Sequence, residues 1–311
     1  MAFYTVDAAM HQILGDLVQA LQQDSRPGLG QQISITWLRH PASLLDRAAD
    51  LDPTDFWSLP WHGTSWKGDR LRYPASVVKL LYLVAAEAWL QQDLLAEDPE
   101  LRRALAAMVR ESSNNATAHV VDRLSGTTDG PELPLAAMAS WVAQRQLVNG
   151  WMASLGWPEL AGFNACQKTW DDGPYGRERA FYGDANANRN ALSTDGVARM
   201  LLAVIASAVV SPPACRRMRA LLERSLDRSE RDADPLNQVD GFLGGFLPPE
   251  ARLWSKAGWM SQARHDAAYI EMEGVAEANL LVVFSEGVAC AQDEQLLPSI
   301  AERLIQARLH V

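Results

Sequence analysis

Ser76 and Lys79 are the first residues along the chain whose types and spacing could do chemistry. They lie in the stretch Tyr73–Leu83, where an extended approach containing Pro74 leads into an apolar run that predicts a long helix. Side chains three positions apart share one face of a helix, so the hydroxyl and the amine can meet. A serine hydroxyl needs a base to take its proton, and a partly desolvated lysine can act as that base. The pair therefore predicts a nucleophile with its base.

Lysine is rare in this chain, which draws attention to the lysines that fall in motifs. Only 4 of the 28 basic residues are lysines, and the other 24 are arginines. Arginine stays protonated in proteins, whereas a buried lysine titrates readily. Lys79 and Lys256 lie in short motifs. Lys67 and Lys168 do not, and we expect these two lysines to be solvated.

Two further motifs follow the first pair. Ser113-Asn114-Asn115 lies in a predicted loop between helices, and Lys256-Ala257-Gly258 lies in a predicted strand. Each motif alone is common, and the structural alternative is that Ser76 and Asn115 cap helices while Lys79 extends along the surface. The order of the three motifs and their predicted settings favour a single shared site.

The order S-x-x-K, S-x-N, K-x-G resembles that of class A β-lactamases and penicillin-binding proteins. Flanking residues agree, because Ser113–Ala118 is similar to the family run S-D-N-T-A-A and Arg264-His265-Asp266 is similar to R-N-D. The resemblance extends over roughly residues 32–309. It implies a two-lobed serine hydrolase that moves an acyl group from an amide or ester to Ser76 and then to water.

The resemblance also implies roles for the first two motifs. Ser76 would be the nucleophile, and Lys79 would be its base or proton shuttle. Ser113 would relay a proton to the leaving group. Asn115 would hydrogen-bond the substrate amide and the Lys79 amine.

The third motif would hold the substrate. Lys256 would bind a substrate carboxylate and polarise the Ser113 hydroxyl, with Ala257 and Gly258 completing the motif. The backbone N–H groups of Ser76 and Trp259 would form the oxyanion hole, whose donors each contribute about 10²–10³ in rate.

Three departures from the family pattern point to a different acyl substrate. The family's E-x-x-L-N, whose glutamate activates the deacylating water, does not occur. Glu178 is the nearest carboxylate of the right kind and Asp184 the second, but an arginine-flanked glutamate such as Glu178 is often a structural ion pair. Ala257 lacks the hydroxyl of the family's threonine or serine, and Trp259 brings a large ring after the glycine.

Several functions stay open at this point. A β-lactamase is one, a cytoplasmic amidase or esterase is another, and the serine-dependent glutaminases, which share the fold and S-x-x-K, are a third. A catalytically silent relative that binds a ligand or partner in the cleft is the alternative outside enzymes. Retention of both motif lysines in a lysine-poor chain argues against that silent relative.

The surrounding elements predict an α+β, β-lactamase-like fold. Apolar periodicity predicts helices near 6–23, 76–92, 100–111, 116–124, 134–147, 150–155, 196–210, 212–226 and 296–309. Alternation predicts strands at 33–38, 252–259, 266–273 and 279–285, with a less distinct strand around 55–61 or just after it. Residues 161–190 are expected to form a long loop. The antiparallel sheet and terminal helices (1–72 and 211–311) would form one lobe, with an all-helical lobe (73–210) inserted.

Composition limits the partners. The net charge of -10 argues against nucleic acid or an anionic membrane, so a small amide or ester substrate is expected, and the oligomeric state is not predicted. The six histidines and three cysteines form no metal motif, and no cofactor is expected. The N-terminus lacks a basic region followed by an apolar run, so we expect a cytoplasmic location with buried, unpaired cysteines.

Overall fold

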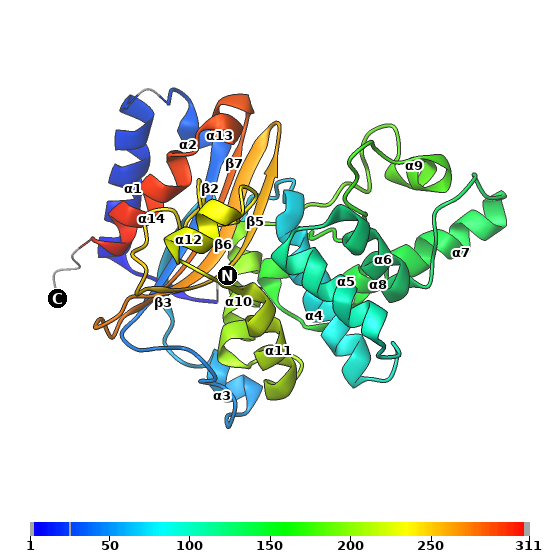
Figure 1. The fold of residues 1–311 in the computed structure, drawn as a ribbon, viewed down its shortest axis with the longest axis horizontal. Coiled ribbons are helices and arrows are strands. Elements are labelled where there is room, and N and C mark those ends of the chain that lie inside the picture. Colours follow the sequence, from blue (N-terminus) through cyan, green and yellow to red (C-terminus); the bar gives the residue numbers. More distant parts are fainter. Residues whose placement is uncertain (1–2, 25, 308–311) are drawn as a thin grey trace.

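A seven-stranded sheet forms the centre of one half of the molecule (Figure 1). The computed structural model describes residues 3–24 and 26–307. The strand order is β1-β3-β2-β7-β6-β5-β4, with β1 and β3 parallel and every other pair antiparallel. The strands are β1 (Thr5–Val6), β2 (Ile33–His40), β3 (His62–Trp66), β4 (Glu223–Arg224), β5 (Arg252–Met260), β6 (Ala263–Glu271) and β7 (Ala278–Glu286). The predicted combination of a mainly antiparallel sheet with terminal helices is confirmed.

The less distinct strand of the sequence analysis lies just after the Trp- and Pro-rich run. Residues 62–66 form β3, whereas 53–57 form a short helix, α3 (Pro53–Trp57). Pro53 occupies the first turn of that helix and Asp52 accepts a hydrogen bond from Thr54 N at its start. A proline and a capping carboxylate at these positions favour a helix over a strand.

Two terminal helices cover one face of the sheet, at the left of Figure 1. They are α1 (Ala8–Gln23) and α14 (Leu296–Ile305). Asp7 begins α1 by accepting a hydrogen bond from Met10 N, and the buried stripe includes Met10, Leu14 and Leu21. These residues and those of α14 belong to one apolar cluster together with Ile35 and Val283 of the sheet. The terminal helices are therefore held to the sheet by burial of their apolar stripes.

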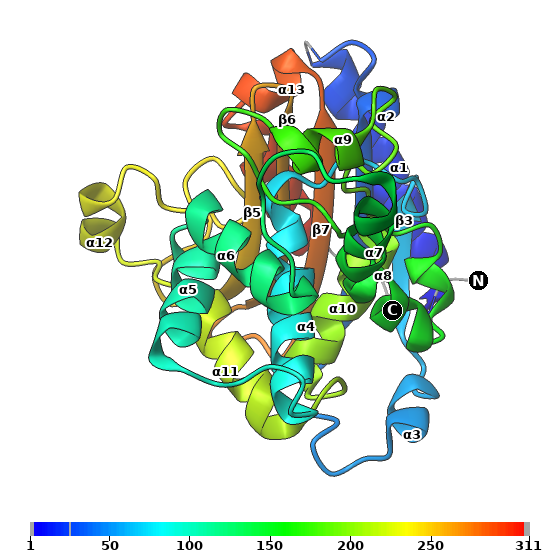
Figure 2. The ribbon, with the colours of Figure 1, turned by 90° about the vertical axis from the view of Figure 1, so that its right-hand side faces the viewer.

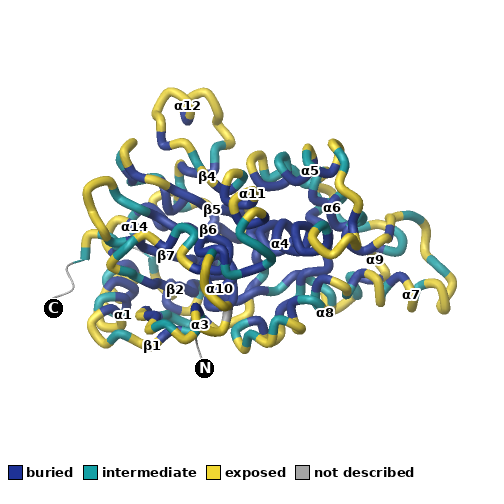
Figure 3. Tube along the Cα trace, turned by 90° about the horizontal axis from the view of Figure 1, so that it is seen from below, coloured by how far each residue is buried: buried dark blue, intermediate teal, exposed yellow. Residues whose placement is uncertain are grey.

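Helices from the middle of the chain lie on the other side of the sheet, and Figure 2 shows them in front of it. The longer ones are α4 (Val78–Gln91), α5 (Pro99–Arg110), α6 (Asn114–Ser125), α7 (Leu135–Arg145), α8 (Leu147–Ser154), α10 (Thr194–Ala206) and α11 (Pro212–Leu222). Helix α4 is buried almost all round, as Figure 3 shows. A helix with apolar residues on every side must be central, and α4 is.

The division into two predicted lobes remains a prediction. Helix α10 falls in the predicted helical lobe, yet it packs against β2, β6 and β7 of the sheet. One apolar cluster contains residues of α4, α10 and the sheet, among them Leu81, Leu201 and Val282. Burial is therefore continuous from the sheet into the helical region.

Short elements complete the chain. The predicted loop at 161–190 contains a helix, α9 (Gly176–Tyr182). The remaining short pieces are α2 (Leu29–Gln32), η1 (Ala75–Val77), η2 (Pro158–Leu160), α12 (Arg228–Ala233) and α13 (Val288–Gln292). The three cysteines are buried and unpaired, as predicted. Among the residues described, no helix has the length and apolar character needed to cross a membrane.

Candidate active site

Ser76 lies in a strained turn, η1, directly before α4. Ala75 has φ of 46°, a left-handed conformation that residues with a Cβ rarely adopt. Such backbone costs about 1–3 kcal/mol and is found mostly at functional sites. The turn leaves the Ser76 side chain only half-buried. The nucleophile predicted from sequence is therefore accessible on a fixed backbone.

A neutral histidine holds the segment that leads into this turn. His265 Nε2 donates to the Tyr73 carbonyl at 2.9 Å, while Ser285 N donates to His265 Nδ1 at 3.0 Å. Burial lowers the pKa of His265 to about 4. The ring is thus neutral near pH 7, and both its nitrogens have partners.

Strand β5 approaches the same turn closely. A Cβ added at Gly258 would lie 2.9 Å from both Ser76 N and the Pro74 carbonyl. Only glycine allows this distance between the strand and η1. The structure therefore brings Gly258 of the third motif directly beside Ser76 of the first.

Lys79 is fully buried, with 0% of its surface exposed. Its Nζ donates to the Ser112 carbonyl, to Ser112 Oγ at 3.2 Å and to Asn114 Oδ1 at 2.9 Å. Burial lowers the pKa of the Lys79 amine to about 7, and the nearby Asp171 carboxylate opposes the shift. Near pH 7 the amine is thus partly neutral and can accept a proton.

The second motif lies one residue earlier than predicted. The contact expected between Asn115 and Lys79 is made by Asn114, and Asn115 is exposed. Ser113 Oγ accepts a hydrogen bond from Ala116 N and caps α6. Ser112, with φ of 56°, is the serine that reaches the lysines. Ser113 and Asn115 therefore lie outside the cluster, and Ser112 and Asn114 lie within it.

Lys256 is also fully buried and meets the same hydroxyl. Its Nζ lies 3.1 Å from Ser112 Oγ, 2.7 Å from the Ala257 carbonyl, and within hydrogen-bonding distance of Gln238 Oε1. Burial, with the charges of Arg224 and Lys79, lowers the pKa of Lys256 well below its usual value. Ser112 Oγ thus lies between two buried amines.

The side chains of Ala257 and Trp259 lie on the same face of the sheet. Successive side chains of a strand alternate between its faces, and Ala257 belongs to the apolar cluster under α1 and α14. Trp259 lies on that side too, where its Nε1 donates to the Ala291 carbonyl at 3.0 Å. The residue is 59% exposed. Its indole therefore contacts α13.

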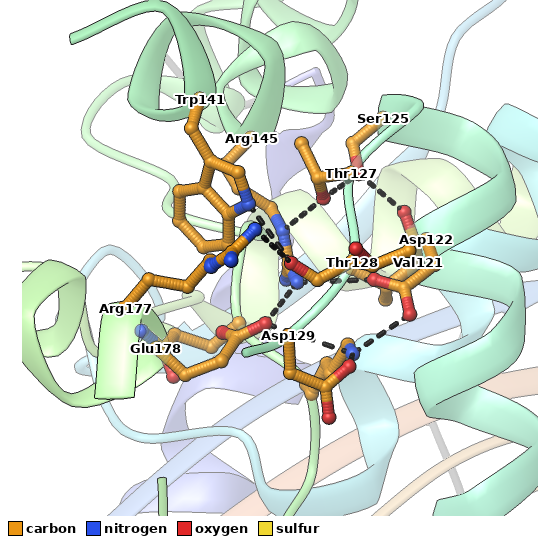
Figure 4. A network of polar contacts seen from close by, with 12 residues as sticks. Val121, Asp122, Ser125, Thr127, Thr128, Asp129, Trp141, Arg145, Arg177 and Glu178 are labelled. Atoms are coloured by element: carbon orange, nitrogen blue, oxygen red, sulfur yellow. Dashed lines mark hydrogen bonds and ion pairs between the residues drawn. The ribbon is translucent and has the colours of Figure 1, made fainter. Parts of the chain in front are cut away.

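Glu178 is part of a buried ionic network (Figure 4). It is 0% exposed and pairs with Arg145 of α7, while Lys168 Nζ lies 3.6 Å from it. Burial raises the pKa of Glu178, and both cations oppose the shift. No hydrogen bond or ion pair joins Glu178 to Ser76 or Lys79 among the described residues. The arrangement is that of a structural ion pair.

Lys168 corrects a second expectation, because it is buried and not solvated. Its Nζ donates to Asp122 Oδ2 at 2.8 Å and to Asp129 Oδ1 at 2.7 Å. One oxygen each of Asp122, Asp129 and Glu178 lies within 4.8 Å of the others, a spacing that could hold a metal ion. Lys168 supplies a cation in contact with all three. Asp184, the second candidate base, is exposed and pairs with Arg179 at 3.5 Å.

Asp171 is the carboxylate that reaches the lysine cluster. Asn114 Nδ2 donates a hydrogen bond to Asp171 Oδ1, and Asn114 Oδ1 accepts one from Lys79 Nζ. Sequence reasoning missed Asp171, Ser112, Asn114 and Gln238. Two signals were available: Ser112-x-Asn114 is itself an S-x-N pattern, and Asp171 lies inside the long loop. Nothing local marked Gln238.

Comparison with solved structures shows that this fold is known. The chain is similar to a β-lactamase from Sphaerobacter thermophilus, with 17% identity, a TM-score of 0.58, and coverage of 94% of this chain and 96% of that one. A β-lactamase from Chitinophaga pinensis gives 14% identity, a TM-score of 0.61 and the same coverage. An ancestral class A β-lactamase gives 15% identity, a TM-score of 0.58, and coverage of 95% of this chain and 100% of that one. The TM-scores and the coverage show a common fold, which confirms the β-lactamase-like fold predicted from the sequence.

Sequence comparison gives the family. A search of curated proteins found no match. The sequence model described as the Beta-lactamase enzyme family matches residues 89–307, which include Ser112, Asn114, Asp171 and Lys256. The match begins after Ser76 and Lys79, so these two rest on the geometry. More than half of the chain is matched, and the chain therefore belongs to the β-lactamase enzyme family.

Proposed function

We propose that this β-lactamase-like protein is a serine hydrolase that forms an acyl-enzyme on Ser76 and releases it to water. One observation carries the proposal: Ser112 Oγ lies 3.2 Å from Lys79 Nζ and 3.1 Å from Lys256 Nζ. Two buried amines joined by a hydroxyl form a path for protons, and the path begins one helical turn from Ser76.

Acylation starts at Lys79. Its neutral amine takes the proton of the Ser76 hydroxyl, and Oγ forms a bond to the carbonyl carbon of the amide or ester. Ser112 then gives its proton to the leaving nitrogen or oxygen and receives the proton held by Lys79. The bond to the leaving group breaks, and Lys79 is neutral again.

The oxyanion is held by backbone N–H groups of Ser76 and Trp259. The carbonyls of Ser255 and Ala257 accept hydrogen bonds from Arg224 and Lys256, outside the sheet ladder. In an antiparallel strand the N–H and C=O of one residue point the same way, and this direction repeats at every second residue. Trp259 N–H therefore points to the same open edge, where Gly258 meets Ser76.

Deacylation needs a base for water, and Asp171 is better placed for this than Glu178. Water attacks the acyl carbonyl, Asp171 accepts its proton, and that proton returns to Ser76 Oγ as the acid leaves. The Asp171 carboxylate contacts Asn114, which contacts Lys79. Glu178 is occupied by Arg145 within the buried network.

Intact-mass spectrometry tests the proposal. The protein and its Ser76→Ala variant are incubated with a fluorophosphonate and, separately, with a penicillin. A fluorophosphonate adduct that the variant lacks is the expected result. A penicillin adduct lost in the same variant adds β-lactam recognition, and its lifetime reports deacylation. If neither reagent gives a Ser76-dependent adduct, the protein is a silent relative and the catalytic roles are withdrawn.

A further inference from the structure

The segment between β4 and β5 inserts one side chain into the corner of the site. Within it, α12 is largely exposed (Figure 3), but Gln238 is only 8% exposed. Val239 and Leu243 belong to the apolar cluster under α1 and α14. The backbone that carries Gln238 is therefore anchored in the core.

Both ends of the Gln238 amide have partners. Oε1 accepts from Lys256 Nζ, and Nε2 donates to the Arg110 carbonyl at 2.6 Å and to the Val109 carbonyl at 3.3 Å. These carbonyls end α5, where no further helical N–H is available. Gln238 thus bridges the end of a helix and the lysine of the third motif.

This contact completes the hydrogen bonding of Lys256. Its Nζ has three oxygen neighbours: Ser112 Oγ, Gln238 Oε1 and the Ala257 carbonyl. An ammonium would donate one N–H to each. A neutral amine would donate two hydrogen bonds and accept the third from the Ser112 hydroxyl. In both forms no N–H remains for an oxygen of a ligand.

The neighbouring cation is engaged as well. Arg224 donates to the Val109 carbonyl at 2.9 Å, to the Arg110 carbonyl at 3.2 Å and to the Ser255 carbonyl at 3.1 Å. Ala257 offers no hydroxyl, and its side chain is buried in the apolar cluster on the far face. An entering carboxylate would thus lose water and find no free N–H on Lys256.

We infer that Gln238 excludes anionic groups from Lys256, so that the acyl substrate is an amide or ester without a carboxylate beside the scissile bond. The part of this inference that concerns the substrate rests on the proposed function. The exclusion itself is a binding property and can be measured without catalysis.

Calorimetric titration with benzylpenicillin and its methyl ester tests the inference. The two probes differ only in the carboxylate, and the Ser76→Ala background keeps both intact. With Gln238 present, the ester should bind at least as tightly as the acid. Gln238→Ala and Gln238→Ser should each tighten acid binding relative to ester binding by about tenfold, the value of one charge-assisted hydrogen bond. Gln19→Ala, on the exposed side of α1, is the matched control and should leave the ratio unchanged.

Opposite results are equally clear. The inference is overturned if both Gln238 variants unfold at the parental temperature and show the same ratio of acid to ester affinity as the parent. It is also overturned if these variants do not bind the acid at all. Fluorophosphonate labelling of Ser76 separates this from the proposed function. Labelling without a change in ratio removes the inference alone, whereas a change in ratio without labelling removes the hydrolase and keeps the exclusion.

Discussion

At the scale of residues, the environment of Lys79 determines its chemistry. Its amine is fully buried among the oxygens of Ser112 and Asn114, and burial lowers its pKa to about 7. An exposed lysine would be almost wholly protonated at this pH. The carbonyl and amide oxygens hold the amine in place without contributing a full charge. Burial therefore supports the proposed role of Lys79 as a base near neutral pH.

Acylation of Ser76 should therefore rise with pH through about 7, since only the neutral Lys79 amine accepts a proton. The rate of fluorophosphonate labelling from about pH 5 to about pH 9 measures this. Lys79→Arg keeps the positive charge but cannot deprotonate, so labelling should fall by about 10²–10⁴. A wild-type rate that is flat with pH, or an unimpaired Lys79→Arg variant, would contradict this role.

Ser112 and its neighbour Ser113 form a matched pair for mutation. Ser112→Ala removes the hydroxyl between the two amines and should lower kcat with little change in stability. Ser113→Ala removes the cap of α6, so the free energy of unfolding should fall by about 1 kcal/mol while kcat changes less. Steady-state kinetics and thermal unfolding of both variants show which of the two serines acts in catalysis. A greater loss of kcat in Ser113→Ala would restore the register predicted from sequence.

Sequence could predict Ser76, Lys79 and Lys256 because each pattern occurs once in a distinct setting. It could not choose between two overlapping S-x-N patterns, Ser112-x-Asn114 and Ser113-x-Asn115. That choice depends on the left-handed backbone at Ser112 and on which amide reaches Lys79 across the fold. Neither is a local property of the sequence.

At the scale of elements, contact between β5 and η1 joins the first motif to the third. In Gly258→Ala the new Cβ would meet Ser76 N and the Pro74 carbonyl at 2.9 Å, backbone atoms that cannot move aside freely. We expect the strand and the turn to separate and Ser76 labelling to slow by at least about tenfold, because small misplacements of reacting groups are costly.

Gly15→Ala is the control for this substitution. An added Cβ at Gly15 meets nothing within 4 Å, and the residue lies inside α1. Alanine there should stabilise the protein by about 0.5–1 kcal/mol and leave labelling unchanged. If Gly258→Ala labels as fast as Gly15→Ala, the close approach has no role in the site.

The segment from Lys168 to Glu178 carries two carboxylates: Glu178, which is in a buried ion pair, and Asp171, the proposed deacylation base. Asp171→Asn should lengthen the life of the acyl-enzyme with little change in stability, because Asp171 is exposed and contacts Asn114. Glu178→Gln leaves Arg145 without its buried partner and should cost about 3–5 kcal/mol of stability. Adduct lifetimes by mass spectrometry and thermal unfolding measure the two effects. A long-lived adduct in Glu178→Gln alone would return the base to Glu178.

The sequence predicts a long loop at residues 161–190, which contains this segment, but not the partners of its side chains. The sequence predicts that Glu178, flanked by arginines, can form an ion pair. Among the described residues its partners are Arg145 of α7 and Lys168, and not its own neighbours Arg177 and Arg179. These partners are brought together by the fold, so sequence spacing could not identify them.

At the scale of the whole molecule, the sheet separates two apolar clusters, and charged side chains are buried near the free edge of β5. Lys256 of β5 is fully buried there beside half-buried Arg224, and Asp266 is fully buried on the neighbouring strand β6. Burial of so many ionisable groups opposes folding unless they are paired or neutral. Their protonation therefore couples the site to the stability of the entire fold.

Asp266 makes this coupling measurable. It is fully buried, Leu243 N donates to its Oδ2 at 3.1 Å, and Oδ1 has no hydrogen-bond partner among the residues described. Burial raises the pKa of Asp266 from 3.8 to about 7, and Arg224 and Lys256 oppose the shift. Between these values the folded protein binds more protons than the unfolded chain, so stability should fall as pH rises through this range.

Asp266→Asn imitates the protonated carboxyl at every pH and should remove this dependence. At about pH 8 the variant should be more stable than the parent by up to about 4 kcal/mol, with the difference shrinking toward about pH 5. Urea unfolding at both pH values measures it. Ionised Asp266 could instead stabilise the fold through Arg224 and Lys256, and Asp266→Asn would then be less stable than the parent at both pH values. That result would mean that the charges of Asp266, Arg224 and Lys256 are paired strongly enough to offset their burial.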